Sequence, residues 1–245
     1  DLRSVSAFLL IRSSDLVENA VHMVAWPAVL ADVQYWLVLI GITGFLVVLT
    51  FQITLPMIEE NKRIAIERAL FKVVPGAVSR RDFMVTADGI VAADDSNGEG
   101  TLVYAGYDEQ DRLIGVALEA AKQGYQDILR LLYSFDPECQ CIRGIQVLKM
   151  AETPGIGDKI SKDPQFQENF VKLDARLSAD GSALANAIVM VKHGSKTEPW
   201  QIDAISGATI SSQAVARMLN DSAQQVVPKI MTYLNQMQVS GKELP

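Results

Sequence analysis

The sequence predicts an α+β fold that consists of an N-terminal transmembrane helix and one larger domain with a mainly antiparallel sheet and flanking helices. Three observations support this fold class: a long uncharged stretch near the N-terminus, several strand-like segments in the middle, and an amphipathic helical pattern near the C-terminus. Strands grouped along the chain with helices at the ends are typical of α+β domains. The 245 residues suffice for one sizeable domain and a membrane anchor.

The transmembrane helix is predicted at residues 35–56. No charged residue occurs from Tyr35 to Leu55, and a helix of this length spans roughly 32 Å, which fits the hydrocarbon core of a bilayer. A buried core helix would normally show a polar stripe, and a signal peptide would end in a small-residue cleavage site. We therefore expect a span that stays attached, with Tyr35 and Trp36 at one interface and Pro56 at its end.

Two segments flank this span. Residues 1–34 are mixed in polarity, a composition that fits an amphipathic helix on the membrane as well as an ordinary surface helix. Residues 57–80 are predicted to form a membrane-proximal helix and linker, because an apolar helical pattern ends there at Pro75 and Gly76.

Basic residues near the span predict its orientation. Lys62, Arg63, Arg68 and Lys72 follow it, whereas the few basic residues before it lie farther away. By the positive-inside rule alone, the large domain would be cytoplasmic.

The remaining residues, 81–240, are predicted to form the single large domain. Residues 82–100 are polar and fit a loop or a weak hairpin, and residues 124–133 fit either a strand or a helix. Alternating or continuous apolar runs predict strands, the first two of which form a hairpin. These strands are expected at 101–107, 112–118, 141–148 and 187–192.

Several kinds of site are excluded by residue counts. With only His22 and His193, a histidine-rich zinc site is unavailable, and a Ser-His-Asp arrangement would depend on His193. Cys139 and Cys141 are too few for a metal cluster; we expect a free pair, with a disulfide or redox pair as the alternative in an oxidising compartment. The net charge of −7, without a basic stripe, argues against nucleic acid as a partner. No metal site and no catalytic residue are predicted.

The stretch from Asp203 to Ser212 carries the strongest functional signal. It ends a turn at Thr209 and continues into an amphipathic helix. Because the first amides of a helix lack partners and the helix dipole favours negative charge, a phosphate beside Thr209 would find donors. Ser211 or Ser212 is the expected N-cap, although an ordinary capped turn would have the same pattern.

A second stretch, from Glu152 to Ile160, is suited to contact a flat ring. Pro154 fixes one backbone dihedral, while two nearby glycines allow close backbone approach. A tight exposed turn is the alternative interpretation. The aromatic residues that could stack on a ring are expected to pack in the core instead; they are Phe166, Phe170 and Trp200.

Together these stretches resemble the FMN-binding domain in the G subunit of Rnf complexes and the C subunit of sodium-pumping NADH:quinone reductases. The second stretch is similar to the motif E-T-P-G-L-G-D-K-I, with Ile156 in place of leucine. The first is similar to D-x-x-[ST]-G-A-T-x-[ST], and its matching residues are Asp203, Ser206, Gly207, Ala208, Thr209 and Ser211.

The resemblance implies roles for these residues. Thr209 would carry FMN through a phosphoester bond. A flavin transferase would recognise Asp203, Ser206, Gly207 and Ala208, and these four residues and Ser211 would also belong to the cofactor-binding site. The loop would pack beside the isoalloxazine and would contribute four cofactor-binding residues, which are Glu152, Thr153, Gly155 and Gly157.

The resemblance also implies a function. It describes a membrane-anchored electron carrier in a multi-subunit, ion-translocating complex that links NADH and ferredoxin, rather than a stand-alone enzyme. Other membrane and peripheral subunits and membrane lipid would be its partners. It would cross the bacterial inner membrane once with the large domain outside, contrary to the charge rule.

The residues Asp158 and Lys159 favour the Rnf branch of this family. The alternatives are an Nqr-type quinone reductase subunit, an accessory flavoprotein of another respiratory or regulatory system, or a flavin-free assembly scaffold.

Overall fold

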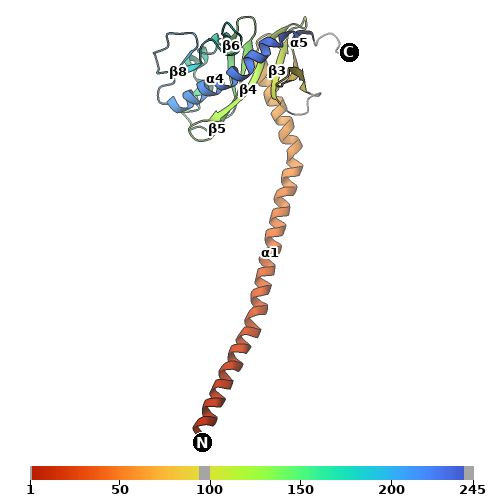
Figure 1. Cartoon of the computed structure of the whole chain (residues 1–245), viewed down its shortest axis with the longest axis vertical. Helices are drawn as coiled ribbons and strands as arrows, with labels where there is room; N and C mark the ends of the chain where they lie inside the picture. The colour runs from red at the N-terminus through yellow and green to blue at the C-terminus, as the bar shows by residue number, and fades with distance from the viewer. Residues whose placement is uncertain (1, 94–99, 240–245) are drawn as a thin grey trace. The chain divides into compact units, whose positions relative to one another are not determined.

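The computed structural model describes residues 2–93 and 100–239, with their side chains from residue 33 to residue 238 (Figure 1). The chain divides into two compact units, residues 1–61 and residues 62–245. Each is described by itself.

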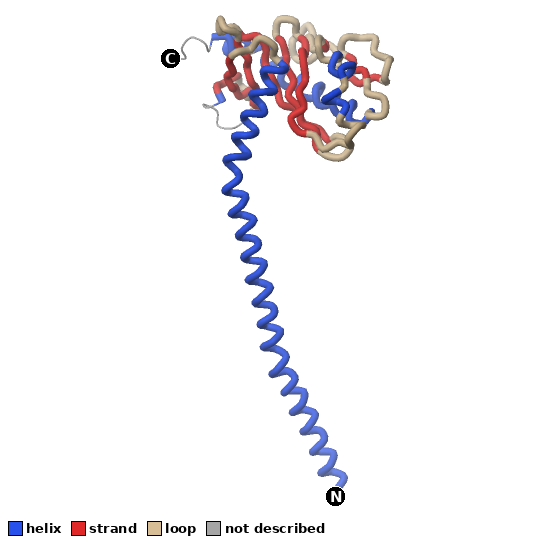
Figure 2. Tube along the Cα trace, turned by 180° about the vertical axis from the view of Figure 1, so that it is seen from behind, coloured by secondary structure: helices blue, strands red, loops and turns tan. Residues whose placement is uncertain are grey.

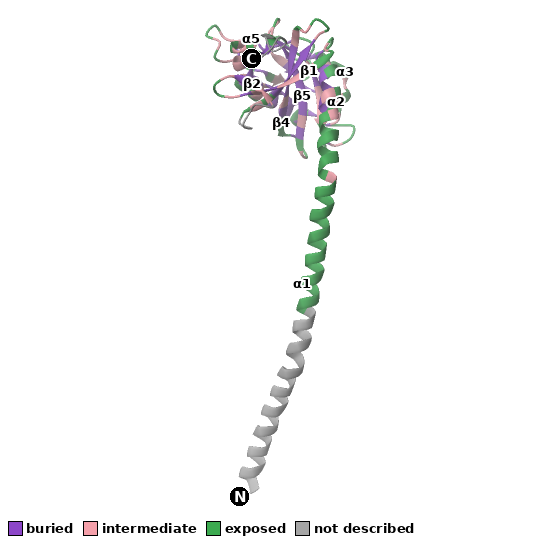
Figure 3. Cartoon of the chain, turned by 90° about the vertical axis from the view of Figure 1, so that its right-hand side faces the viewer, coloured by how far each residue is buried: buried purple, intermediate pink, exposed green. Residues whose placement is uncertain are grey.

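The first unit consists of helix α1, Leu2–Val73, which extends into the second unit. Its part from Val33 onward is long and apolar enough to cross a membrane, with none of its most apolar segment buried in the protein. Figure 3 shows this exposure in green. From residue 33 to residue 61 every residue is exposed except Thr54, which is half-buried. The hydroxyls of Thr50 and Thr54 donate to the carbonyls of Leu46 and Thr50, at 2.7 and 2.9 Å. These bonds satisfy polar groups that apolar surroundings would otherwise leave unpaired.

The predicted helix end at Pro56 is wrong, because α1 continues through this residue to Val73. A proline removes only one backbone hydrogen bond, and helices tolerate it where the flanking sequence forms helix strongly. The side chains of residues 1–32, for which an amphipathic face was considered, lie outside the described residues.

The second unit is built on a seven-stranded antiparallel sheet in the order β2-β1-β3-β4-β5-β6-β7, with its strands red in Figure 2. Its strands are β1 Ser79–Val85, β2 Ile90–Ala92, β3 Thr101–Tyr107, β4 Leu113–Gln123, β5 Ile128–Asp136, β6 Cys141–Lys149 and β7 Leu173–Asp174. Two further strands, β8 Val189–Val191 and β9 Gln201–Asp203, pair in parallel. The predicted α+β class and mainly antiparallel sheet are confirmed.

The strand predictions hold with adjusted ends. The predicted hairpin is β3–β4, and the two later predicted strands are β6 and β8. The segment 124–133, for which a strand and a helix were both considered, is a turn followed by β5. Part of the polar segment 82–100 forms a hairpin, since β1 pairs with β2.

Helices cover both faces of this sheet. The alternation of side chains along β3 divides the core, because neighbouring residues of a strand point to opposite faces. Val103 and Ala105 belong to the apolar core that includes the long helix α4, Thr209–Thr232, whereas Tyr104 belongs to a separate cluster with Leu70 and Val73 at the end of α1. Two short helices, α2 Lys159–Lys162 and α3 Pro164–Glu168, and the final helix α5, Leu234–Val239, complete the unit.

The turn between β5 and β6 holds a disulfide between Cys139 and Cys141. The expectation of a free pair is therefore wrong. The intervening Gln140 adopts a φ of 49°, and this turn brings the two cysteines together although only one residue separates them.

Candidate flavin cleft

Both sequence motifs line one cleft of about 550 Å³, although they lie some fifty residues apart in the chain. One wall comes from the loop after β6 and the other from the start of α4. Of the predicted site residues, the cleft is lined by Glu152, Thr153, Gly157, Gly207, Ala208, Thr209 and Ser211. The fold thus brings residues of the two motifs to one cleft.

Backbone hydrogen bonds close the loop on itself. The amides of Ile156 and Gly157 both donate to the carbonyl of Thr153. Gly155 has a φ of +79°, which favours glycine, and its amide donates to Asp158 Oδ1 at 2.6 Å. Asp158 also accepts from Lys162, and this bond is the main reason that the pKa of Asp158 is lowered. These hydrogen bonds hold the loop in a tight turn that forms one wall of the cleft, but Gly155 does not line the cleft.

Glu152 joins this loop to two other segments. Its Oε2 accepts a hydrogen bond from Ser211 Oγ at 2.7 Å, and its Oε1 accepts from the amides of Tyr125 and Gln126 at 2.9 and 3.3 Å. The residue is buried, with 7% of its surface exposed. One carboxylate therefore connects α4, the loop after β6 and the turn between β4 and β5.

Thr209 is the first residue of α4, and no side chain caps the helix. The predicted N-cap is wrong: Ser211 and Ser212 are buried inside the first turn, where Ser211 donates to Glu152 and Ser212 Oγ accepts from the amide of Ile205 at 3.1 Å. Both serine side chains are thus engaged elsewhere. The first amides of α4 remain available to an acceptor in the cleft.

The turn before α4 has an exposed tip and a buried start. Ser206, Gly207 and Thr209 are exposed, whereas Ala204 and Ile205 are buried. Gly207 adopts a φ of +84° with open space where a side chain would begin.

Two predicted residues of this motif lie apart from the cleft. Asp203 and Ser206 line a smaller hollow of about 150 Å³ together with Phe166 and His193. The Asp203 carboxylate accepts from the amide of Gly194 at 2.7 Å and lies 3.4 Å from His193 Nδ1. Its position supports the turn rather than the cleft.

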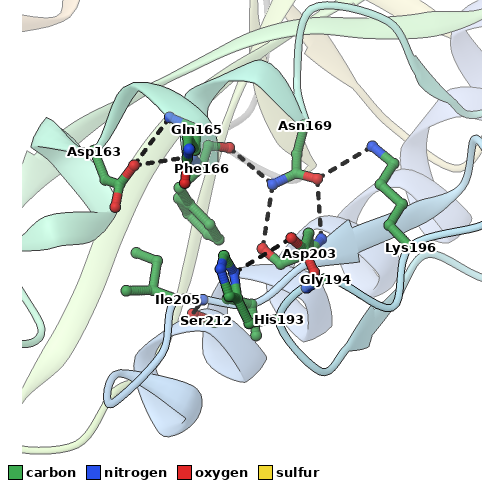
Figure 4. A network of polar contacts seen from close by, with 11 residues as sticks. Asp163, Gln165, Phe166, Asn169, His193, Gly194, Lys196, Asp203, Ile205 and Ser212 are labelled. Carbon is green, nitrogen blue, oxygen red and sulfur yellow. Dashed lines mark hydrogen bonds and ion pairs between the residues drawn. The ribbon is translucent and has the colours of Figure 1, made fainter.

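Asn169 fixes the backbone of Asp203 (Figure 4). Its side-chain oxygen accepts from the amide of Asp203 at 2.9 Å, and its nitrogen donates to the carbonyl of the same residue at 3.2 Å. Lys196 Nζ also donates to the oxygen, at 3.1 Å. Burial lowers the pKa of Lys196, while the nearby Asp203 acts in the opposite direction.

The exposed edge of the cleft is apolar. Tyr125, Ile156 and Ile210 line it and keep 64%, 49% and 52% of their surface exposed. Tyr125 and Ile210 were not among the predicted site residues. Gly124, which begins the turn that carries Tyr125, was the only local signal. As expected, Phe166 and Phe170 pack in the core, edge to face.

These features fit FMN. The cleft offers an exposed threonine hydroxyl, uncapped helix amides, a glycine-rich wall and an apolar edge. Phosphate suits the helix amides, and a flat aromatic ring suits an apolar edge.

Comparisons with known proteins agree with this fit. A family model described as the FMN-binding domain matches residues 124–224. The G subunit of an ion-translocating oxidoreductase complex from Methanosarcina acetivorans is 38% identical over 133 residues, which cover 54% of this chain and 62% of the relative. The G subunit of a proton-translocating ferredoxin:NAD(+) oxidoreductase complex from Clostridium ljungdahlii is 30% identical over 116 residues, or 47% of this chain and 55% of the relative. The chain therefore matches somewhat over half the length of these relatives.

Two solved structures share the fold. NqrC from Shewanella oneidensis aligns with a TM-score of 0.55 at 18% identity, over 74% of this chain and 99% of that one. The C subunit of a Na(+)-translocating NADH-quinone reductase from Parabacteroides distasonis aligns with a TM-score of 0.56 at 21% identity, over 71% and 95%. The predicted resemblance to an FMN-binding domain and to G subunits of ion-translocating complexes is confirmed, and the two C subunits share the fold.

Proposed function

We propose, from the match of residues 124–224 to the FMN-binding domain model, that this chain is a membrane-anchored electron-carrier subunit of an Rnf-type ion-translocating complex. The observation that carries the proposal is the position of Thr209, which begins α4 inside a cleft formed by both motifs. FMN, when bound, supplies one- and two-electron transfer, and the residues of the chain hold and orient it.

Thr209 is the proposed attachment residue, through a phosphoester bond between its hydroxyl and the FMN phosphate. Its side chain is exposed, as a modifying enzyme requires. The uncapped amides at the start of α4 and the positive end of the helix dipole stabilise the phosphate. A covalent link would also retain the cofactor outside the cytoplasm, where it could not be replaced readily.

The loop from Thr153 to Gly157 forms the wall beside the ring in this proposal. The apolar side chains of Tyr125, Ile156 and Ile210 line the same cleft and exclude water from part of it. Ser206, Gly207 and Ala208 shape the turn that presents Thr209, while Asp203 anchors that turn.

Helix α1 is the proposed membrane anchor, and bilayer lipid is its partner. Its large apolar residues from Val33 to Ile58 are exposed to their surroundings, which a bilayer would match. We place the large domain outside the cytoplasm of a bacterial cell, as the resemblance implied. The disulfide between Cys139 and Cys141 supports this side, because such bonds persist in oxidising compartments.

The chain works as a relay that depends on other membrane and peripheral subunits. The curated relatives are named as G subunits of ion-translocating complexes, and one of these complexes connects ferredoxin and NAD(+) by its name. This naming supports the Rnf branch over the Nqr branch, whose C subunits share the fold at lower identity.

Flavin fluorescence on a denaturing gel tests the proposal. The protein from its native membrane should fluoresce after denaturation, and Thr209→Ala should abolish the signal because the attachment oxygen is gone. Thr153→Ala is the matched control, since it removes a hydroxyl from the same cleft and should leave a covalent signal. No fluorescence in the parent would favour a flavin-free scaffold, and fluorescence in Thr209→Ala would place the link elsewhere.

A further inference from the structure

Glu152 is the only charged side chain among the described residues that line the cleft. It is buried, and the ion pairs of the described residues do not include it. Burial of a lone carboxylate is costly unless hydrogen bonds replace its hydration.

Hydrogen bonds supply this compensation. All three partners of Glu152 donate to it: the amides of Tyr125 and Gln126 and the hydroxyl of Ser211. An ionised carboxylate only accepts hydrogen bonds, so this set of donors suits the charged form. Ser211 also lies in the first turn of α4, where the helix dipole favours negative charge.

Two glycines leave the room that this carboxylate occupies. A Cβ atom at Gly157 would lie 2.7 Å from Glu152 Oε2 and 3.1 Å from Ser211 Oγ, and one at Gly124 would collide with Oε1. Neither glycine has a positive φ, so close packing against Glu152 rather than backbone conformation requires them. The surroundings of Glu152 are thus built from three separate segments.

We propose that Glu152 is a positioning residue whose buried negative charge lowers the reduction potential of the flavin in this cleft. The inference rests on the proposed function and assigns Glu152 a role through its position and charge, because both of its oxygens accept hydrogen bonds from protein donors. Its two oxygens hold the β4–β5 turn and α4 against the loop. An electron added to the flavin increases negative charge nearby, and a fixed carboxylate in a weakly screened site opposes this increase.

Two substitutions separate charge from position. Glu152→Gln removes the charge and keeps the length: the amide oxygen can accept from Tyr125 and Gln126, while Ser211 Oγ can rotate to accept from the amide nitrogen. Glu152→Asp keeps the charge but is one methylene shorter, so it cannot reach both sides. Glu198→Gln is the matched control, because it removes the charge of an exposed residue outside the cleft.

The experiment uses the full flavin-carrying chain in detergent. A spectroelectrochemical titration gives the flavin midpoint potential, and fluorescence anisotropy reports how tightly the flavin is held. We expect Glu152→Gln to raise the flavin midpoint potential by about 59 mV, which corresponds to a roughly tenfold change in the one-electron equilibrium constant. The fluorescence anisotropy should equal that of the parent. Glu152→Asp should keep the parent potential and lower the anisotropy, and Glu198→Gln should change neither.

Several results would overturn the inference. These are an unchanged potential in Glu152→Gln, equal shifts in Glu152→Gln and Glu152→Asp, or loss of folding in Glu152→Gln by circular dichroism. A parent chain without flavin would instead overturn the proposed function, and this inference with it.

Discussion

Asn169 shows how much one buried side chain contributes to the turn that carries Thr209. Only 5% of its surface is exposed, and its amide group makes four hydrogen bonds. Two of them pair with the backbone of Asp203 in the manner of a neighbouring strand. The side chain thus pairs with the N–H and C=O of Asp203, the last residue of β9, as the backbone of a neighbouring strand would.

Replacement of this amide should weaken the domain. Asn169→Ala leaves the amide and carbonyl of Asp203 and the Lys196 ammonium without this partner, and we expect a loss of about 2–4 kcal/mol in the free energy of unfolding. Urea denaturation followed by circular dichroism measures it. The control is Asn220→Ala, which removes one acceptor of a backbone amide, that of Ile188, and should cost about 1 kcal/mol. Equal losses would contradict the special role of Asn169.

At the scale of elements, the central strands bury tyrosines against helices on both faces of the sheet. Tyr104 on β3 packs against the end of α1, and Tyr133 on β5 packs in the core that includes α4, where its hydroxyl lies 2.8 Å from Ser222 Oγ. Burial raises the pKa of Tyr104 to about 12. Burial also raises the pKa of Tyr133, although the Ser222 hydroxyl opposes this effect.

These shifts predict a loss of stability in alkali. The folded domain keeps both phenols protonated above the ordinary tyrosine pKa of about 10, whereas the unfolded chain releases the protons. The stabilisation is complete below pH 10 and declines as the pH rises toward 12. Urea denaturation at pH 8, 10 and 11 should show this decline, and Tyr104→Phe should show a shallower one. An identical pH dependence in both proteins would exclude Tyr104 as a cause.

At the scale of the whole molecule, an exposed apolar helix and a domain with its own core occur in one chain. The core of the second unit uses residues from Ile66 onward, so the unit at 62–245 contains the packing that its sheet requires. In the first unit, the apolar side chains that the structure describes, from Val33 to Ile58, are exposed instead. This difference is the physical basis for assigning a bilayer to one unit and an aqueous compartment to the other.

The proposed location of the large domain outside the cytoplasm can be tested in spheroplasts. A protease added outside spheroplasts should degrade the large domain of the full chain, because we place that domain outside the cytoplasm. A chain limited to residues 62–245 lacks the apolar segment and should stay soluble and protected inside. Protection of the full chain until the membrane is permeabilised would support the orientation that the positive-inside rule predicts.

The sequence by itself determined the α+β class, the apolar helix, four of the nine strands that the structure describes and the two motifs that line the cleft. Apolar periodicity and the absence of charge are local properties, so they predicted β3, β4, β6 and the apolar part of α1 without knowledge of neighbours. The residue types of the two motifs likewise predicted a rigid loop and a phosphate-binding helix start. Thr209 lies where this reasoning placed it.

Only the tertiary structure decided the contacts between segments distant in the sequence. Glu152 reaches Ser211 across 59 residues and Tyr125 across 27, and Asn169 reaches Asp203 across 34. Such pairings depend on how the sheet and α4 pack, so no local pattern reveals them. The same packing gives Ser211 and Ser212 buried partners instead of capping roles, and it separates Asp203 and Ser206 from the cleft that the rest of their motif lines.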